Sequence, residues 1–357
     1  MSTDIIQEAR RQTEICNACR YCEGFCSVFP ALTRQKAFAD GDISHLANLC
    51  HNCRGCYYSC QYTEPHEFAL NFPAALAEVR QDSWERFAWP APLARRFHES
   101  GVLLALAVAI AFAVAFWLMQ MLRPVSGEGF YAYLAHGVMV AVFAPAFLLP
   151  LASVAISLRC YWRETGGGRL YLQDVLGGFR AAASLKNLNG GQSQGCNFED
   201  EDRYTDTRRW LHQAVMYGFL LCFASTSSGT ILHYAFDMQA PYGFFSLPKL
   251  LGIPGGVLLT IGTVGLAWLK TKADPKLGAM RVWGGEMAFI MLLGTTGATG
   301  LALYAATGTG AVATLLAIHL GCVLAFFLTL PYSKMVHGFY RLTALIIENQ
   351  KAREHKS

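Results

Sequence analysis

The sequence lacks the signatures of several common protein classes. Its formal net charge is only +4 over 357 residues, and no basic stripe interleaved with aromatic residues is present, so no nucleic-acid partner is expected. No Gly-x-Gly-x-x-Gly fingerprint follows a strand and opens a helix, which argues against FAD binding by that route. Neither a catalytic triad nor a carboxylate pair stands out. The chemistry must therefore be sought in the cysteines and the apolar segments.

The opening residues, MSTDIIQEARRQ, also lack the apolar core of a signal peptide. The segment after them is therefore expected to stay in the cytoplasm, where thiols remain reduced. The chain has 12 cysteines, and eight of them lie within residues 1–100. In a reducing compartment, such closely spaced cysteines indicate metal ligands rather than disulfides.

These eight cysteines form two copies of one pattern, C-x2-C-x2-C-x3-C, in CNACRYCEGFC (16–26) and CHNCRGCYYSC (50–60). In two-cluster ferredoxins with this spacing, the fourth cysteine of each run ligates the other cluster. The pattern predicts two [4Fe–4S] clusters, one held by Cys16, Cys19, Cys22 and Cys60, the other by Cys50, Cys53, Cys56 and Cys26. A local alternative keeps each fourth cysteine with its own array. Structural zinc fits less well, because zinc sites usually pair two short hairpins across a longer spacer.

No alternating strand pattern occurs in residues 1–80, and helices are expected within 30–49 and 67–81. A helical ferredoxin-like domain is therefore predicted over residues 1–80. Residues 81–100 contain tryptophans suited to a membrane boundary and two prolines that should stop a helix, and they are predicted to form an interfacial linker.

Residues 101–348 contain six apolar segments, each near the 20 or so residues that a membrane span needs. The predicted spans are 101–122, 131–158, 210–236, 250–269, 287–306 and 311–332. Lysine and arginine gather in alternate connections, which predicts a multi-pass protein of the bacterial cytoplasmic membrane with both termini cytoplasmic. The polar segment 159–209 is either a docking loop or a flexible one, and 349–357 is a short tail. The whole chain is thus expected to be all-α, with a helical ferredoxin domain followed by a six-helix haem b domain.

Histidines near the spans are candidate haem ligands, because ionisable groups in membranes are rare and usually functional. His212 begins the third span and His337 follows the sixth, so both should lie at similar depth near the cysteine domain. One haem b is predicted between them. His319 precedes His337 by 18 residues, about 27 Å along a helix, and would serve a second, outer haem with His233 or His136.

The stretch HLGCVLAFFLTLPYSKMVH, from His319 to His337, resembles the last haem-bearing helix of the membrane subunit of respiratory nitrate reductase. That family has two haem ligands 18 residues apart there, around a turn that is Pro-Tyr-Ser-Lys in this chain. Its partner helix carries two histidines ten residues apart; His212 matches the first, whereas Cys222 occupies the second position. The resemblance thus implies the inner haem on His212 and His337, and an outer haem would need a replacement ligand.

With its two arrays, the motif GCNFEDED (195–202) and the six-helix region, the chain resembles the citrate-utilisation protein B family, also called tricarballylate utilisation protein B, over essentially its full length. This resemblance implies a membrane electron-transfer protein. It would reoxidise the flavin of a separate cytosolic FAD-dependent tricarballylate dehydrogenase and pass electrons through two [4Fe–4S] clusters and haem b to quinone. The same layout, fused to a flavoprotein, occurs in a cobalamin ring-contraction enzyme family.

Three other functions stay open. Electrons could flow in reverse, from quinol to a cytosolic acceptor. A membrane-anchored iron–sulfur sensor would bind neither haem nor quinone. A thiol–disulfide reductase would need further paired cysteines, whereas only the isolated Cys160, Cys196, Cys222 and Cys322 remain.

Overall fold

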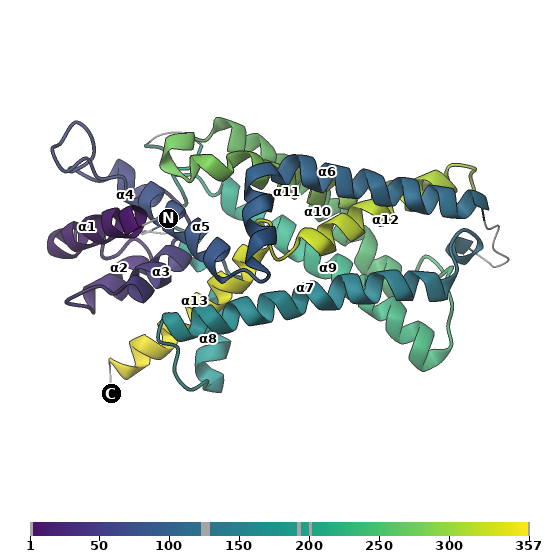
Figure 1. Cartoon of the computed structure of the whole chain (residues 1–357), viewed down its shortest axis with the longest axis horizontal. Helices are drawn as coiled ribbons and strands as arrows, with labels where there is room; N and C mark the ends of the chain where they lie inside the picture. Colours follow the sequence, from purple (N-terminus) through teal and green to yellow (C-terminus); the bar gives the residue numbers. More distant parts are fainter. Residues whose placement is uncertain (1–2, 123–128, 191–193, 200–201, 356–357) are drawn as a thin grey trace.

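The computed structural model describes residues 3–122, 129–190, 194–199 and 202–355. Regular structure within these ranges is helical, apart from one isolated β-bridge between Cys196 and Thr205. Figure 1 shows an elongated molecule, with short helices at one end and long helices extending away from them. The predicted all-α class is therefore confirmed.

The cysteine domain occupies one end of the molecule (Figure 1). It comprises α1 (Thr3–Cys19), α2 (Val28–Thr33), α3 (Asp40–Leu49), α4 (Gly55–Tyr58) and α5 (Phe72–Phe87). Fully buried Leu32, Ile43, Leu46 and Leu76 form the centre of its apolar core. The ends of these helices and the loops between them surround this core. They carry the two cysteine arrays.

Six helices are long and apolar enough to cross a membrane, by length and composition, in the part of the chain that the structure describes. They are Ser100–Leu122 within α6 (Ala91–Leu122), α7 (His136–Glu164), α9 (Thr207–Phe236), α10 (Leu247–Lys272), Met280–Ala305 with α11 (Trp283–Ala305), and α12 (Val312–Thr329). Many large apolar side chains on these helices are exposed, as lipid-facing residues would be; Leu103 is 70% exposed. The six helices are compatible with a multi-pass membrane protein and correspond to the six predicted segments.

Helix boundaries differ from the expected ones in two places. Most of the expected linker is helical, because α5 continues to Phe87 and α6 already begins at Ala91. Pro90 does separate these helices, but Pro92 falls in the first turn of α6, where its missing N–H is not needed. The second span continues to Glu164, whose carboxylate accepts hydrogen bonds from Arg86 at 2.6 and 2.7 Å. Contacts with the cysteine domain therefore extend helices that hydropathy alone would end.

The described part of the segment after α7 contacts both the cysteine domain and the C-terminal helix. It contains α8 (Leu172–Ala183) and the 3-10 helix η2 (Lys186–Leu188). Asn187 accepts hydrogen bonds from the backbone N–H and hydroxyl of Ser27, and the N–H of Asn197 donates to the carbonyl oxygen of Cys53 at 2.9 Å. These hydrogen bonds join the segment to the cysteine domain, and its role as a docking loop stays a prediction.

The last helix, α13 (Val336–Glu354), continues beyond the end of α12 and lies below the cysteine domain in the view of Figure 1. Arg34 of the cysteine domain donates two hydrogen bonds of 2.6 Å to Glu348. Arg353 pairs with the buried Asp174 of α8. The N-terminal domain and the C-terminal helix therefore lie at the same end of the bundle.

A tight contact between α3 and the end of α7 provides a test of this docking. A Cβ atom on Gly41 would lie 2.1 Å from the carbonyl oxygen of Glu164, so Gly41→Ala should force the two elements apart. We expect a loss of about 1–3 kcal/mol in unfolding free energy, measured as a lower melting temperature in detergent. Gly24→Ala is the matched control, because a Cβ there meets no described atom within 4 Å. Equal melting temperatures for the two variants would contradict this packing.

Candidate functional site

The eight array cysteines line two adjacent cavities. The larger, of about 240 Å³, is lined by Cys16, Cys19, Cys22 and Cys60 together with several tyrosines. The smaller, of about 20 Å³, is lined by Cys26, Cys50, Cys53 and Cys56, and Cys56 also reaches the larger one. The fold thus groups each fourth cysteine with the first three of the other array. Which thiolates ligate which cluster stays a prediction.

Left-handed backbone conformations give these cysteine loops their sharp turns. Arg20, Asn52 and Arg54 have φ values of 57°, 53° and 71°. Non-glycine residues adopt such values uncommonly, and mostly in turns. Here they redirect the chain directly after Cys19 and on either side of Cys53, so that successive cysteines turn toward the cavities rather than continue along a helix.

The thiol environment fits metal clusters. Burial, reinforced by neighbouring thiols, raises the pKa of Cys16 and of Cys22 to about 12. Without a metal these thiols are therefore protonated at neutral pH, and a cluster would displace their protons. No three Cys, His, Asp or Glu side chains in the described ranges converge on a position for a single metal ion. Whether these thiols hold iron–sulfur clusters stays a prediction at this point.

His212 and His337 face each other at the end of the spans nearest the cysteine domain. Their ring centroids are 5.8 Å apart. A metal held about 2 Å from one nitrogen of each imidazole would put the centroids about 6 Å apart. Nδ1 of His337 donates to the carbonyl oxygen of Lys334, and the buried Nδ1 of His212 has no hydrogen-bond partner among the described residues. This separation is compatible with one metal ion held between the two rings, and a haem b at this place stays a prediction.

The ionisation state of His337 also suits a metal ligand. Burial, followed by the positive charge of Arg341, lowers the pKa of His337 well below its ordinary value. The imidazole is therefore neutral at physiological pH, which is the form that binds iron.

The outer histidines form a different arrangement from the expected one. The rings of His136 and His233 stack with centroids 4.1 Å apart, and Nε2 of His136 lies 2.9 Å from the hydroxyl of Tyr234. His319 instead packs against α11, with its Nδ1 3.1 Å from the hydroxyl of Thr299. The structure thus brings His136 and His233 together, while His319 faces another helix. A second haem stays a prediction.

Three arginines that the sequence did not single out as site residues hold the loop of the second array. Arg80 of α5 donates to the carbonyl oxygen of Cys50 at 2.7 Å, and Arg341 of α13 donates to the same oxygen at 3.1 Å. Arg208 of α9 donates to the carbonyl oxygen of Asn52 at 2.6 Å. Arg80, Arg208 and Arg341 are called the arginine clamp below. Burial and the neighbouring guanidinium groups lower the pKa of Arg341 to about 9, so it stays charged at neutral pH.

The clamp and the histidine pair share two helices. Arg208 precedes His212 by four residues, and Arg341 follows His337 by four, so each arginine lies one helical turn from a histidine on the same face. Each helix therefore presents an imidazole and, one turn away, an arginine that binds the loop around Cys50. The spacings Arg-x3-His and His-x3-Arg are visible in the sequence, but these arginines resemble ordinary membrane-flanking charges.

The motif GCNFEDED covers the second array from the other side. The ring of Phe198 lies between two guanidinium groups, 4.4 Å from that of Arg54 and 4.0 Å from that of Arg208. Its neighbour Asn197 binds the Cys53 carbonyl, as described above. Two acidic residues of the motif, Asp200 and Glu201, lie outside the described residues. The described part of the motif therefore packs against the second array at Cys53 and Arg54.

Comparison with known proteins agrees with this two-part organisation. Residues 9–85 match the family model "Citrate utilization protein B Fer4-like domain", and residues 92–357 match "Citrate utilization protein B". A relative named Citrate utilization protein B, from Escherichia coli, is 41% identical over 356 residues, covering 97% of this chain and 93% of the relative. No solved structure matches the chain. The chain therefore belongs to the citrate utilization protein B family.

Proposed function

We propose that this protein carries electrons from a soluble FAD-dependent dehydrogenase, of the tricarballylate dehydrogenase kind, to the membrane quinone pool. Membership of a citrate-utilisation family with a ferredoxin-like domain supports an electron-transfer role. The observation that carries the proposal is the order of the candidate sites. Two thiol-lined cavities and then a facing imidazole pair follow one another from the far end of the cysteine domain to the start of the spans.

The larger cavity suits the first step from a soluble donor. Cys19 is exposed, and Tyr21 beside it is 70% exposed, so a partner flavoprotein can approach this face closely. We assign this end to the cytoplasm from the lysine and arginine pattern of the connections. The contact between Arg34 and Glu348 supports having both chain ends on that side.

Each carrier would be held by groups already near one another. Cys16, Cys19, Cys22 and Cys60 would hold the outer cluster, and Cys26, Cys50, Cys53 and Cys56 the inner one, while His212 and His337 would hold haem b. When bound, these groups supply one-electron carriers. The protein orients them, keeps water away from the inner sites and offsets their negative charge with the arginine clamp.

A reconstitution experiment tests the function. Purified protein in lipid nanodiscs, mixed with the flavoprotein dehydrogenase, tricarballylate and a quinone analogue, should consume quinone at a rate that depends on this protein. Cys19→Ser should lose about half of the iron and most of that rate, because the outer cluster needs this thiolate. Cys160→Ser, at an exposed cysteine outside the arrays, should change neither. Quinone left fully oxidised with the unaltered protein would instead favour a sensor.

The histidine pair yields a second prediction. His212→Ala or His337→Ala should remove the bis-histidine haem b absorbance, because each variant takes away one axial ligand, while the cluster signals in electron paramagnetic resonance are kept. His66→Ala, at a histidine on a loop of the cysteine domain, is the control and should keep both signals. An unchanged haem spectrum in both test variants would refute the pairing.

The arginine clamp yields a third prediction. Arg341→Gln removes a positive charge beside the inner cluster, which should lower that cluster's reduction potential by about 50 mV or more. It should also slow haem reduction by the reduced clusters. Arg341→Lys should retain most of the potential, because the charge is kept. The control is Arg281→Gln, which breaks surface ion pairs with Glu78 and Glu85. It should leave the inner cluster's reduction potential and the rate of haem reduction unchanged.

A further inference from the structure

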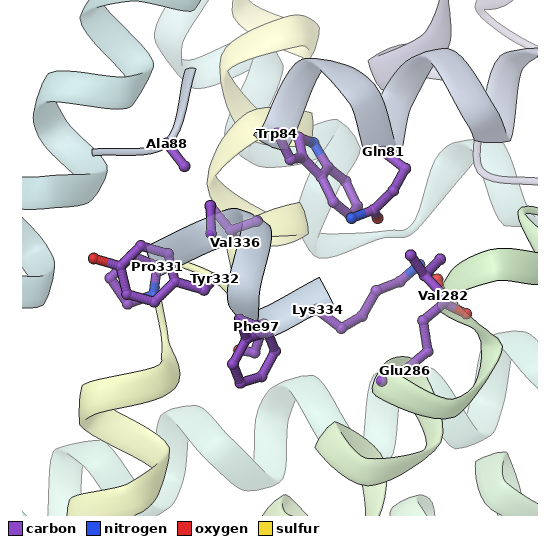
Figure 2. Close-up of a pocket in the computed structure, with 13 residues that line it drawn as sticks. Gln81, Trp84, Ala88, Phe97, Val282, Glu286, Pro331, Tyr332, Lys334 and Val336 are labelled. Carbon is purple, nitrogen blue, oxygen red and sulfur yellow. The ribbon is translucent and has the colours of Figure 1, made fainter. Parts of the chain in front are cut away.

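A small recess lies beside the candidate haem ligand His337, at the end of the spans nearest the cysteine domain. Its walls come from α5, the start of α6, the start of α11 and the turn between α12 and α13. Figure 2 shows Trp84 and Phe97 on two sides of this space, with Lys334 reaching across to Glu286. Gly285, next to Glu286, also lines the recess.

The walls combine flat apolar faces with one buried ammonium group. Trp84 is 4% exposed and Phe97 is 5% exposed. Nζ of Lys334 lies 5.3 Å from the centre of a Trp84 ring and donates to Glu286. Aromatic walls with a few convergent polar groups are typical of a small-molecule site. An ammonium offers three N–H donors, so the matching ligand is flat and apolar with a carbonyl acceptor.

A second ion pair allows Lys334 to turn toward such a ligand. Glu286 also accepts a hydrogen bond of 2.6 Å from Lys270. Its carboxylate therefore keeps a positive partner when Lys334 donates elsewhere. This matters because a buried carboxylate left without a partner is costly.

The recess lies close both to the candidate haem ligand, from which electrons would come, and to the apolar spans, from which a lipid-soluble ligand would enter. The carbonyl oxygen of Lys334 accepts the hydrogen bond from Nδ1 of His337, so one backbone link joins the recess to the candidate haem ligand. On its other side α6 and α11 meet where their apolar spans begin, and a Cβ on Gly284 would lie 3.7 Å from Cγ2 of Val102. A ligand dissolved in the membrane therefore has a short route to this position.

We propose that this recess is the head-group site of the membrane quinone, with Lys334 donating to one quinone carbonyl and Trp84 and Phe97 flanking the ring. The assignment rests on the proposed electron route. Reduction of the quinone to quinol takes two electrons, delivered one at a time from the reduced flavin through the bound carriers. It also takes two protons from water on the cysteine-domain side, and an O–H bond forms at each carbonyl oxygen.

The recess must widen for the ring to enter. Its internal volume is about 20 Å³, which is room for about one water molecule. We expect the recess to widen next to Gly285 when Lys334 moves away from Glu286. This makes Gly285 the position at which an added side chain blocks the quinone most directly.

Gly285→Leu tests the site by filling it. Gly285 lines the recess, and a Cβ at this position meets no described atom within 4 Å, so a larger side chain can be added there without a backbone clash. Full-length protein in nanodiscs is reduced with dithionite, and haem b reoxidation by decylubiquinone is followed by stopped-flow absorbance. We expect a rate at least tenfold lower than in the unaltered protein, and an intermediate rate for Gly285→Ala. Haem content, haem spectrum and cluster signals should be unchanged.

Gly137→Leu is the matched control. Gly137 lies at the start of α7, at the end away from the cysteine domain, and a Cβ there also meets no described atom within 4 Å. It should keep the original rate. Unimpaired reoxidation in Gly285→Leu, with haem present, would overturn the site while leaving the proposed function intact. Failure of the unaltered haem protein to react with the quinone would overturn the proposed function itself. Should Gly285→Leu lose its haem, the smaller Gly285→Ala decides by the same rate.

Discussion

The grip of the arginine clamp on the loop around Cys50 is the interaction on which the rest of the structure depends. Its three guanidinium groups come from the cysteine domain, from the start of a membrane helix and from the last helix. Each donates to a backbone carbonyl oxygen of the loop around Cys50, and Arg80 donates also to the carbonyl oxygen of Ala47 near the end of α3. A carbonyl is fixed by the backbone, whereas a carboxylate on a flexible side chain can move. The clamp therefore fixes the position of the loop relative to α9 and α13, the two helices that carry His212 and His337.

Electrostatics gives the clamp a second role. Burying several positive charges together is costly unless negative charge lies close by. An anionic iron–sulfur cluster held by Cys50 and its neighbours would supply that charge, so the clamp and the cluster would stabilise each other. The same reasoning links the Lys334–Glu286–Lys270 group to a ligand acceptor, because that group holds one more positive than negative charge.

Much of this architecture could be predicted from the sequence because its signals are local. Cysteine spacing and the length of apolar runs depend only on neighbouring residues, so the two arrays and the six spans were identifiable. His212 and His337 could be paired because helix order and residue depth alone put them at the same level. The clamp could not be foreseen, since its acceptors are backbone carbonyls, which no residue type marks. The stacking of His136 on His233 depends on which helix faces meet, and periodicity does not encode that.

The predicted helix boundaries were wrong for a related reason. Hydropathy ends the second span where charged residues begin, yet α7 continues to Glu164 because Arg86 and the backbone of α3 meet it there. The expected linker was likewise absorbed into α5 and α6. Local composition thus describes the membrane part well and the junction between the two parts poorly, because tertiary contacts decide the structure of the junction.

The position of α13 has a consequence for biogenesis. The cysteine domain is translated first, but the helix that lies beneath it and supplies Arg341 is translated last. During synthesis the Cys50 loop therefore lacks one of its three arginines, and the face later covered by α13 is open while the spans insert.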